Sequence, residues 1–140
     1  MDSQQLVDAI ATILASAHEE WAWRPDGPAY TDSEVAVVYG ALPSAPNRAI
    51  GITPYIARDD PATGLAIRRV QLRFRGNPRN PNGADALADA AFTTLQGLAR
   101  VAGLNLVTRE SSAPLGADLN DRQERSDNYQ IILDNPEATP

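Results

Sequence analysis

Residues 65–76 read LAIRRVQLRFRG, residues 77–82 read NPRNPN, and residues 83–102 read GADALADAAFTTLQGLARVA. In the first part, apolar Val70, Leu72 and Phe74 alternate with arginines and a glutamine. This period of two is the pattern of a strand with one face on a core and the other facing water or a partner. The stretch therefore predicts a half-buried strand, a tight polar turn and a second element from about residue 83.

The second element is predicted to be a helix that covers this strand. Its apolar residues recur at steps of three or four: Leu87, Ala91, Leu95, Leu98 and Ala102. Twelve extended residues span roughly 40 Å and twenty helical residues roughly 30 Å, so the helix can lie back along the strand. We expect one buried cluster of Val70, Leu72, Phe74, Leu87, Leu95 and Leu98, with Arg69, Arg73 and Arg75 on the opposite face.

The rest of the chain completes one α+β domain. A first helix is predicted from Asp2 or Ser3 to about Ala17, because its apolar residues form a stripe and a breaker cluster follows at 25–28. Further strands are predicted at 34–40, 49–58, 104–109 and 128–133, and residues 110–125 are predicted to form a long loop or a loosely paired hairpin. We expect a single domain over residues 1–135, a mostly antiparallel four- to five-stranded sheet with two helices packed on one face, and a frayed tail at 136–140.

The composition excludes several classes of protein. The 140 residues carry a net charge of −6, which argues against a surface that wraps nucleic acid, because phosphate contacts need clustered cations. The absence of cysteine excludes disulfides, thiol catalysis and cysteine-bound metals. No apolar run approaches the length of about 18 residues that a membrane span needs, and no positively charged segment opens a secretory signal.

Catalytic motifs are absent from the sequence. No glycine-rich nucleotide loop follows a predicted strand, and no G-x-S-x-G turn presents a serine. His18 is the single histidine and lies beside two glutamates at the end of the first helix, where it suits the helix dipole better than a metal site. Acidic residues of the late segment (Asp118, Asp121, Glu124 and Asp127) are interleaved with arginines, which is typical of a solvated surface or an interface rim. We therefore expect no enzyme, no cofactor and no bound metal.

One alternative remains open at the first tryptophans. Trp21 and Trp23 can be interpreted as a platform on which a ligand stacks, or as two aromatic side chains that fix the first helix and its exit loop to the sheet. The second interpretation is favoured because no other aromatic cluster accompanies them. A small ligand-binding or enzymatic domain that uses these residues and the 118–124 segment is the alternative from another functional class.

The core stretch, RRVQLRFRGNPRNPNGADALADAAFTTLQGL, resembles the tail terminator (minor capsid, tail-completion) proteins of long-tailed bacteriophages. In that family a strand ending in a similar run meets a polar turn and then a helix rich in alanine and leucine. The late segment RQERSDNYQIIL is similar to the family's ending, in which an Arg/Glu stretch leads into a final strand. The resemblance covers most of the chain in layout and about forty residues in sequence.

The resemblance implies a virion structural protein of the tail–neck region, made in the host bacterial cytoplasm. It implies a ring of identical subunits, usually six, that caps the tail tube at its head-proximal end and docks to the head connector or stopper protein. DNA would pass through the lumen without specific binding, and six copies would carry 6 × (−6) = −36 charges, so that an acidic lining lets DNA slide. A neighbouring head–tail connector (stopper or neck) subunit is the closest alternative.

Candidate interface residues follow from the charges. Ring closure joins unlike surfaces, so an arginine-rich patch on one subunit needs an acidic patch on the next. The candidates are Arg69, Gln71, Arg73 and Arg75 on the strand, Asp59 and Asp60 in a turn, and Asp118, Asp121, Arg122 and Glu124 in the late segment.

Overall fold

The structure is a computed structural model, and it describes residues 1–134. The elements, in chain order, are α1 (Ser3–Ala17), β1 (Trp21–Trp23), β2 (Val35–Tyr39), β3 (Ala49–Asp59), β4 (Ala66–Pro78), α2 (Gly83–Leu95), β5 (Leu104–Ala117) and β6 (Arg122–Leu133). The tail predicted to be frayed, 136–140, lies outside the described residues. No described helix is long and apolar enough to cross a membrane.

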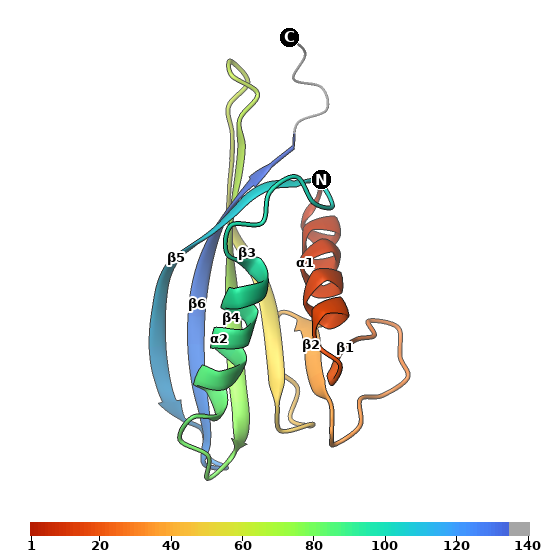
Figure 1. Cartoon of the computed structure of the whole chain (residues 1–140), viewed down its shortest axis with the longest axis vertical. Coiled ribbons are helices and arrows are strands. Elements are labelled where there is room, and N and C mark those ends of the chain that lie inside the picture. Colours follow the sequence, from red (N-terminus) through yellow and green to blue (C-terminus); the bar gives the residue numbers. More distant parts are fainter. Residues whose placement is uncertain (135–140) are drawn as a thin grey trace.

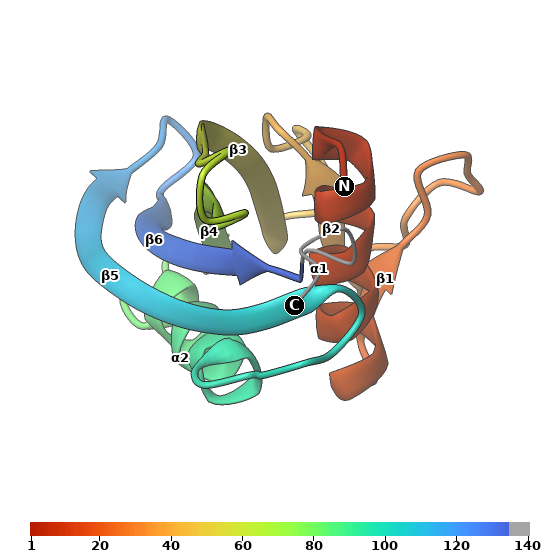
Figure 2. The ribbon, with the colours of Figure 1, turned by 90° about the horizontal axis from the view of Figure 1, so that it is seen from above.

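The strands form one six-stranded sheet in the order β1-β2-β3-β4-β6-β5. Both helices lie on the same face of this curved sheet, α1 against β1 to β3 and α2 against β4 and β6 (Figures 1 and 2). The α+β class and the helix placement are confirmed. The prediction of four to five mostly antiparallel strands is wrong in detail, because β1 is a sixth strand and β1, β2 and β3 are mutually parallel.

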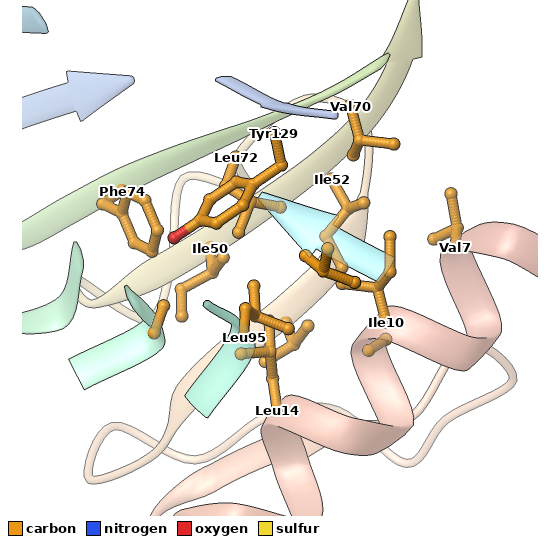
Figure 3. Close-up of a cluster of buried hydrophobic side chains, with 14 of the residues drawn as sticks. Val7, Ile10, Leu14, Ile50, Ile52, Val70, Leu72, Phe74, Leu95 and Tyr129 are labelled. Carbon is orange, nitrogen blue, oxygen red and sulfur yellow. The ribbon is translucent and has the colours of Figure 1, made fainter. Parts of the chain in front are cut away.

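The interior between helices and sheet is filled by the residues that the alternating patterns pointed to. Val70, Leu72 and Phe74 of β4 are buried, and they pack with apolar side chains of both helices (Figure 3). The predicted cluster is therefore confirmed for all its members except Leu98.

Helix α1 begins with a capping box, in which Asp2 accepts from the Gln5 backbone N–H and the Gln5 side chain accepts from the Asp2 N–H.

Leu98 is only partly buried, because α2 ends at Leu95 and not near residue 102. Gly97, with a φ of 79°, turns the chain out of the helix, and its N–H donates to the carbonyl of Val107. The Val107 N–H returns a bond to the Leu98 carbonyl. Backbone pairing with the start of β5 thus replaces the last helical turns that the apolar stripe predicted.

The late segment is a hairpin and not a loop. β5 and β6 pair in antiparallel fashion from residue 104 to residue 133, with register shifts at three places. Thus both strands extend beyond their predicted bounds, 104–109 and 128–133, and only a short turn connects them. β6 pairs with β4 on its other side, so a segment poor in apolar residues is held by hydrogen bonds to strands on both sides.

Candidate assembly surfaces

The face of the sheet that the helices leave uncovered is called the outer face here. In β4 it carries Arg69, Gln71 and Arg73, which alternate with the buried residues. Arg69 Nε donates to Glu110 Oε1 at 2.8 Å, and Arg73 Nε donates to Glu124 Oε1 at 2.7 Å. The hydrogen bond to Glu110 raises the pKa of the Arg69 guanidinium. Both arginines are therefore already paired with acids of their own chain.

Arg75 lies on the outer face, as predicted, but it is buried there by another part of the chain. Only 4% of Arg75 is exposed, and its guanidinium donates to the carbonyls of Pro43, Pro46 and Asn47. Burial lowers the pKa of Arg75, and the nearby positive charge of Arg122 lowers it further. The burial of Arg75 follows from the topology of the sheet. Residues 40–48 connect the parallel strands β2 and β3, and this connection crosses the outer face because the helices occupy the other face.

Gly51 shows how closely this connection packs on the sheet. A Cβ on Gly51 would lie 2.2 Å from the carbonyl oxygen of Gly40, so only glycine fits there. Gln71 lies farther along the outer face, between Thr53 of β3 and Asn128 of β6 in the register of the sheet. The outer face is thus covered near residue 75 and open around residue 71.

The two predicted acidic groups lie at opposite ends of the molecule (Figure 1). Asp59 is bonded to Arg68 at 2.8 Å, and the side chain of Asp60 accepts from the Ala62 N–H, a hydrogen bond that lowers its pKa. Both lie at the tip of the β3–β4 hairpin, which projects beyond the helices (Figure 1). Asp118 and Asp121 lie in the β5–β6 turn at the other end.

The β5–β6 turn is held by its own arginine. Asp118 accepts from both the backbone N–H and the Nε of Arg122, each at 2.8–2.9 Å. Burial opposes ionisation of Asp118, but the hydrogen bonds from Arg122 prevail and lower its pKa. Arg122 also donates to the Ser44 carbonyl and thereby ties the turn to the 40–48 connection.

The acidic residues of β6 do not form a carboxylate pair. Glu124 lies on the outer face opposite Arg75, whereas Asp127 lies opposite buried Leu72 on the helix-covered face. Asp127 is fully buried and accepts from Arg125 and Arg109, and Arg125 also bonds Asp89 on α2. Burial opposes the charge of Arg125, but the hydrogen bonds that it donates to Asp127 and Asp85 prevail and raise the pKa of its guanidinium. This cluster attaches α2 to the sheet, and sequence patterns did not reveal it.

The aromatic and histidine candidates have structural partners. Trp21 is buried and stacks on His18, with ring centroids 3.8 Å apart. The Trp23 indole donates to Asp8 Oδ1 of α1 at 2.9 Å, and His18 Nε2 lies 2.8 Å from Thr94 Oγ1 of α2. The interpretation of the tryptophans as anchors for the first helix fits these contacts. Within residues 1–134, no group of three or more His, Asp or Glu side chains is arranged to hold a metal ion.

Sequence reasoning missed an apolar area on the outer face. Leu106, Ile132 and Ile67 lie directly opposite one another on β5, β6 and β4. The area also includes residues of the projecting hairpin, and we call its six members the outer apolar patch: Tyr55, Ile56, Leu65, Ile67, Leu106 and Ile132. The alternation within residues 69–75 pointed only to arginines and a glutamine on this face, whereas the patch is assembled from four strands.

The sheet is thus covered by helices on one face, and many of its charged side chains are paired within the chain. The family model for the bacteriophage tail terminator protein matches residues 3–135. The chain therefore belongs to the tail terminator family, and it is a structural protein of the phage tail. No curated protein sequence matches it.

A solved structure supports the fold. A chain in the virion of a native gene transfer agent (GTA) particle has 18% sequence identity and a TM-score of 0.54. The superposition covers 93% of this chain and 89% of that one. At this identity the likeness establishes a shared fold.

Proposed function

We propose that this protein forms a closed ring of identical subunits, six in number, that caps the head-proximal end of the tail tube. On this proposal the ring also docks to the head connector or stopper protein, and DNA passes through its lumen without specific binding. The observation that carries the proposal is the family match over residues 3–135. The fold shared with a chain of the gene transfer agent virion agrees with assembly into a particle.

The net negative charge of the chain agrees with the passage of DNA through the ring. Six copies would carry 6 × (−6) = −36 charges, so the ring as a whole repels DNA phosphates. Among residues 1–134, the side chains of nine of the 12 arginines bond polar groups of the same chain; the exceptions are Arg58, Arg79 and Arg100. Few cations are thus left to hold DNA, which favours passage over binding.

Native mass spectrometry tests the ring. One chain weighs 15.0 kDa, so a hexamer would weigh six times that, about 90 kDa, and negative-stain images would show an annulus. Co-expression with the tail tube protein tests the capping role: tubes polymerised with the ring present should be shorter than tubes polymerised without it. A chain that stays monomeric at every concentration would overturn the ring. A ring that binds the connector but leaves tube length unchanged would favour a stopper or neck subunit instead.

A further inference from the structure

The outer apolar patch has the properties of a contact surface. Four of its side chains, Tyr55, Ile56, Leu65 and Leu106, are between 38% and 46% exposed. The first three belong to the β3–β4 hairpin, and Ile67 and Ile132 connect them across the sheet to Leu106 on β5. Soluble monomers seldom leave several large apolar side chains together in water, and such clusters mark interaction sites. Neither the helices nor the 40–48 connection covers this end of the outer face, since the connection packs around Arg75 at the other end.

An unpaired cation lies at the edge of this patch. Arg58 of β3 is directly opposite Ile67, is exposed, and has no side-chain partner among residues 1–134. Its neighbours Arg68 and Arg69 are bonded to Asp59 and Glu110. A surface that would fit the patch must therefore combine apolar or aromatic contact with negative charge.

The chain itself has such a surface, at the opposite edge of the sheet and on the other face. A groove runs along the N-terminal end of α1 and is lined by Asp2, Gln4, Gln5, Asp8, Trp23, Pro25, Asp26 and Tyr39. It contains three carboxylates and no basic residue, and Tyr39 is 49% exposed. Asp26 has no partner within residues 1–134. We call this surface the α1–β1 groove.

We propose that the outer apolar patch of one copy docks on the α1–β1 groove of the next copy. Tyr55, Ile56 and Leu65 then cover Trp23 and Tyr39, and Arg58 lies among the carboxylates. A guanidinium that stacks on an aromatic ring and bonds a carboxylate at the same time suits such a groove. This contact deepens the proposed ring and rests on it.

The positions of the two surfaces suit a closed ring. The patch lies on the outer face at β3 to β5, whereas the groove lies on the helix side at β1, so one copy can use both at once. Contacts between two unlike surfaces join copies head to tail, and such contacts close into a ring when the rotation allows. The projecting β3–β4 hairpin also gains a support, since a two-stranded ribbon is marginally stable alone.

Charge reversal tests the contact. Arg58→Glu and Asp26→Arg are each expected to weaken ring assembly at least tenfold, measured by native mass spectrometry over a dilution series. The double variant, which restores opposite charges across the interface, is expected to recover assembly. Arg79→Glu is the matched control, because Arg79 is also exposed and without a side-chain partner but lies in the turn before α2, at the other end of the molecule. Circular dichroism checks that every variant is folded.

The outcomes separate this contact from the ring itself. If the unchanged chain forms rings and both single reversals assemble like it, the contact is wrong and the ring stands. If the single reversals fail but the double variant does not recover, Arg58 does not face Asp26 and the assignment of the groove is overturned. If the unchanged chain never assembles, the ring fails and this contact with it.

Cross-linking gives an independent test, because the chain has no cysteine. Chains that carry Leu65→Cys are mixed with chains that carry Tyr39→Cys, and a short bis-maleimide reagent is added. Any link between the two kinds of chain joins different copies. We expect a strong heterodimer band, and a much weaker one when Leu119→Cys, in the turn at the other end, replaces Tyr39→Cys. Equal bands would overturn the proposed contact.

Discussion

Arginine residues on one strand have different environments here. Arg69 and Arg73 form ion pairs near the surface, where such pairs contribute little stability, typically about 0–1 kcal/mol. Arg75, two positions farther along, is buried and satisfies three backbone carbonyls of the 40–48 connection. Changing Arg75 would leave those carbonyls unpaired, so it would test folding and not assembly.

Phe74 lies at the centre of the core and is fully buried. Phe74→Ala is expected to lower the free energy of unfolding by ~3–5 kcal/mol, because it removes a large apolar side chain and leaves a cavity. Chemical denaturation at a concentration where the chain is monomeric measures this loss. Tyr55→Ala is the control, since Tyr55 is an exposed aromatic residue on the neighbouring strand. A loss below about 1 kcal/mol for Phe74→Ala would show that the register of β4 is wrong.

Glu34 anchors the loop that precedes β2, and its ionisation should be visible in acid. The hydrogen bond from Arg24, and then that from the Thr31 N–H, lower the pKa of Glu34 to about 2, compared with 4.5 for a free side chain. A pKa lowered by folding stabilises the folded chain above the unfolded value, and the contribution is lost as pH falls from about 4.5 towards 2.

We therefore expect the stability of the unchanged chain to decline through this pH window and the decline to be smaller in Glu34→Gln. Acid titrations followed by circular dichroism measure both, and NMR titration of the Glu34 carboxyl should give a midpoint near 2. Asp32→Asn, in the same loop, controls for the loss of one negative charge. A Glu34 midpoint near 4.5 would contradict the bonded geometry.

The connection from β4 to α2 depends on two glycines. A Cβ on Gly76 would lie 2.5 Å from the Cα of Gly83, and a Cβ on Gly83 would lie 2.9 Å from the Cα of Gly76. Both contacts are with backbone, which has little freedom to shift. The start of the helix therefore rests directly on the end of the strand, and this contact sets how the helix lies on the sheet.

Gly76→Ala is expected to destabilise the chain by about 1–3 kcal/mol, because the added methyl overpacks a backbone contact. Thermal and chemical unfolding of the variant against the unchanged chain measure the effect. Ser112→Ala, on the exposed part of β5, is the control and should change stability little. An unfolding midpoint for Gly76→Ala equal to that of the control would mean that the two backbones lie farther apart than described.

For the whole molecule, assembly and stability should be linked. Only folded chains can assemble into a ring. Mass action therefore predicts that the melting temperature rises with chain concentration. Differential scanning calorimetry over a hundredfold range of concentration measures the rise. Arg58→Glu, which we expect to weaken the ring, should melt at a temperature that depends much less on concentration. A melting temperature independent of concentration in the unchanged chain would argue against a ring at those concentrations.

The α+β class, both helices, the strand at residues 65–76 and most of the buried cluster could be predicted from the sequence alone. These features depend on local periodicity: alternation along β4 and the spacing of leucines and alanines in α2 each identify one buried face. The resemblance to tail terminators rested on the same stretch, and the family match confirms it.

Other features depended on contacts between distant residues. β1 is three residues long, too short for a period to be recognised, and its parallel pairing with β2 is decided by how the chain crosses the sheet. Arg75 has the same spacing as Arg73, yet it is buried because a connection about thirty residues earlier packs over it. The outer apolar patch joins side chains from four strands that no local pattern relates. Local periodicity encodes which residues are buried within an element, whereas only tertiary packing decides what covers the remaining face.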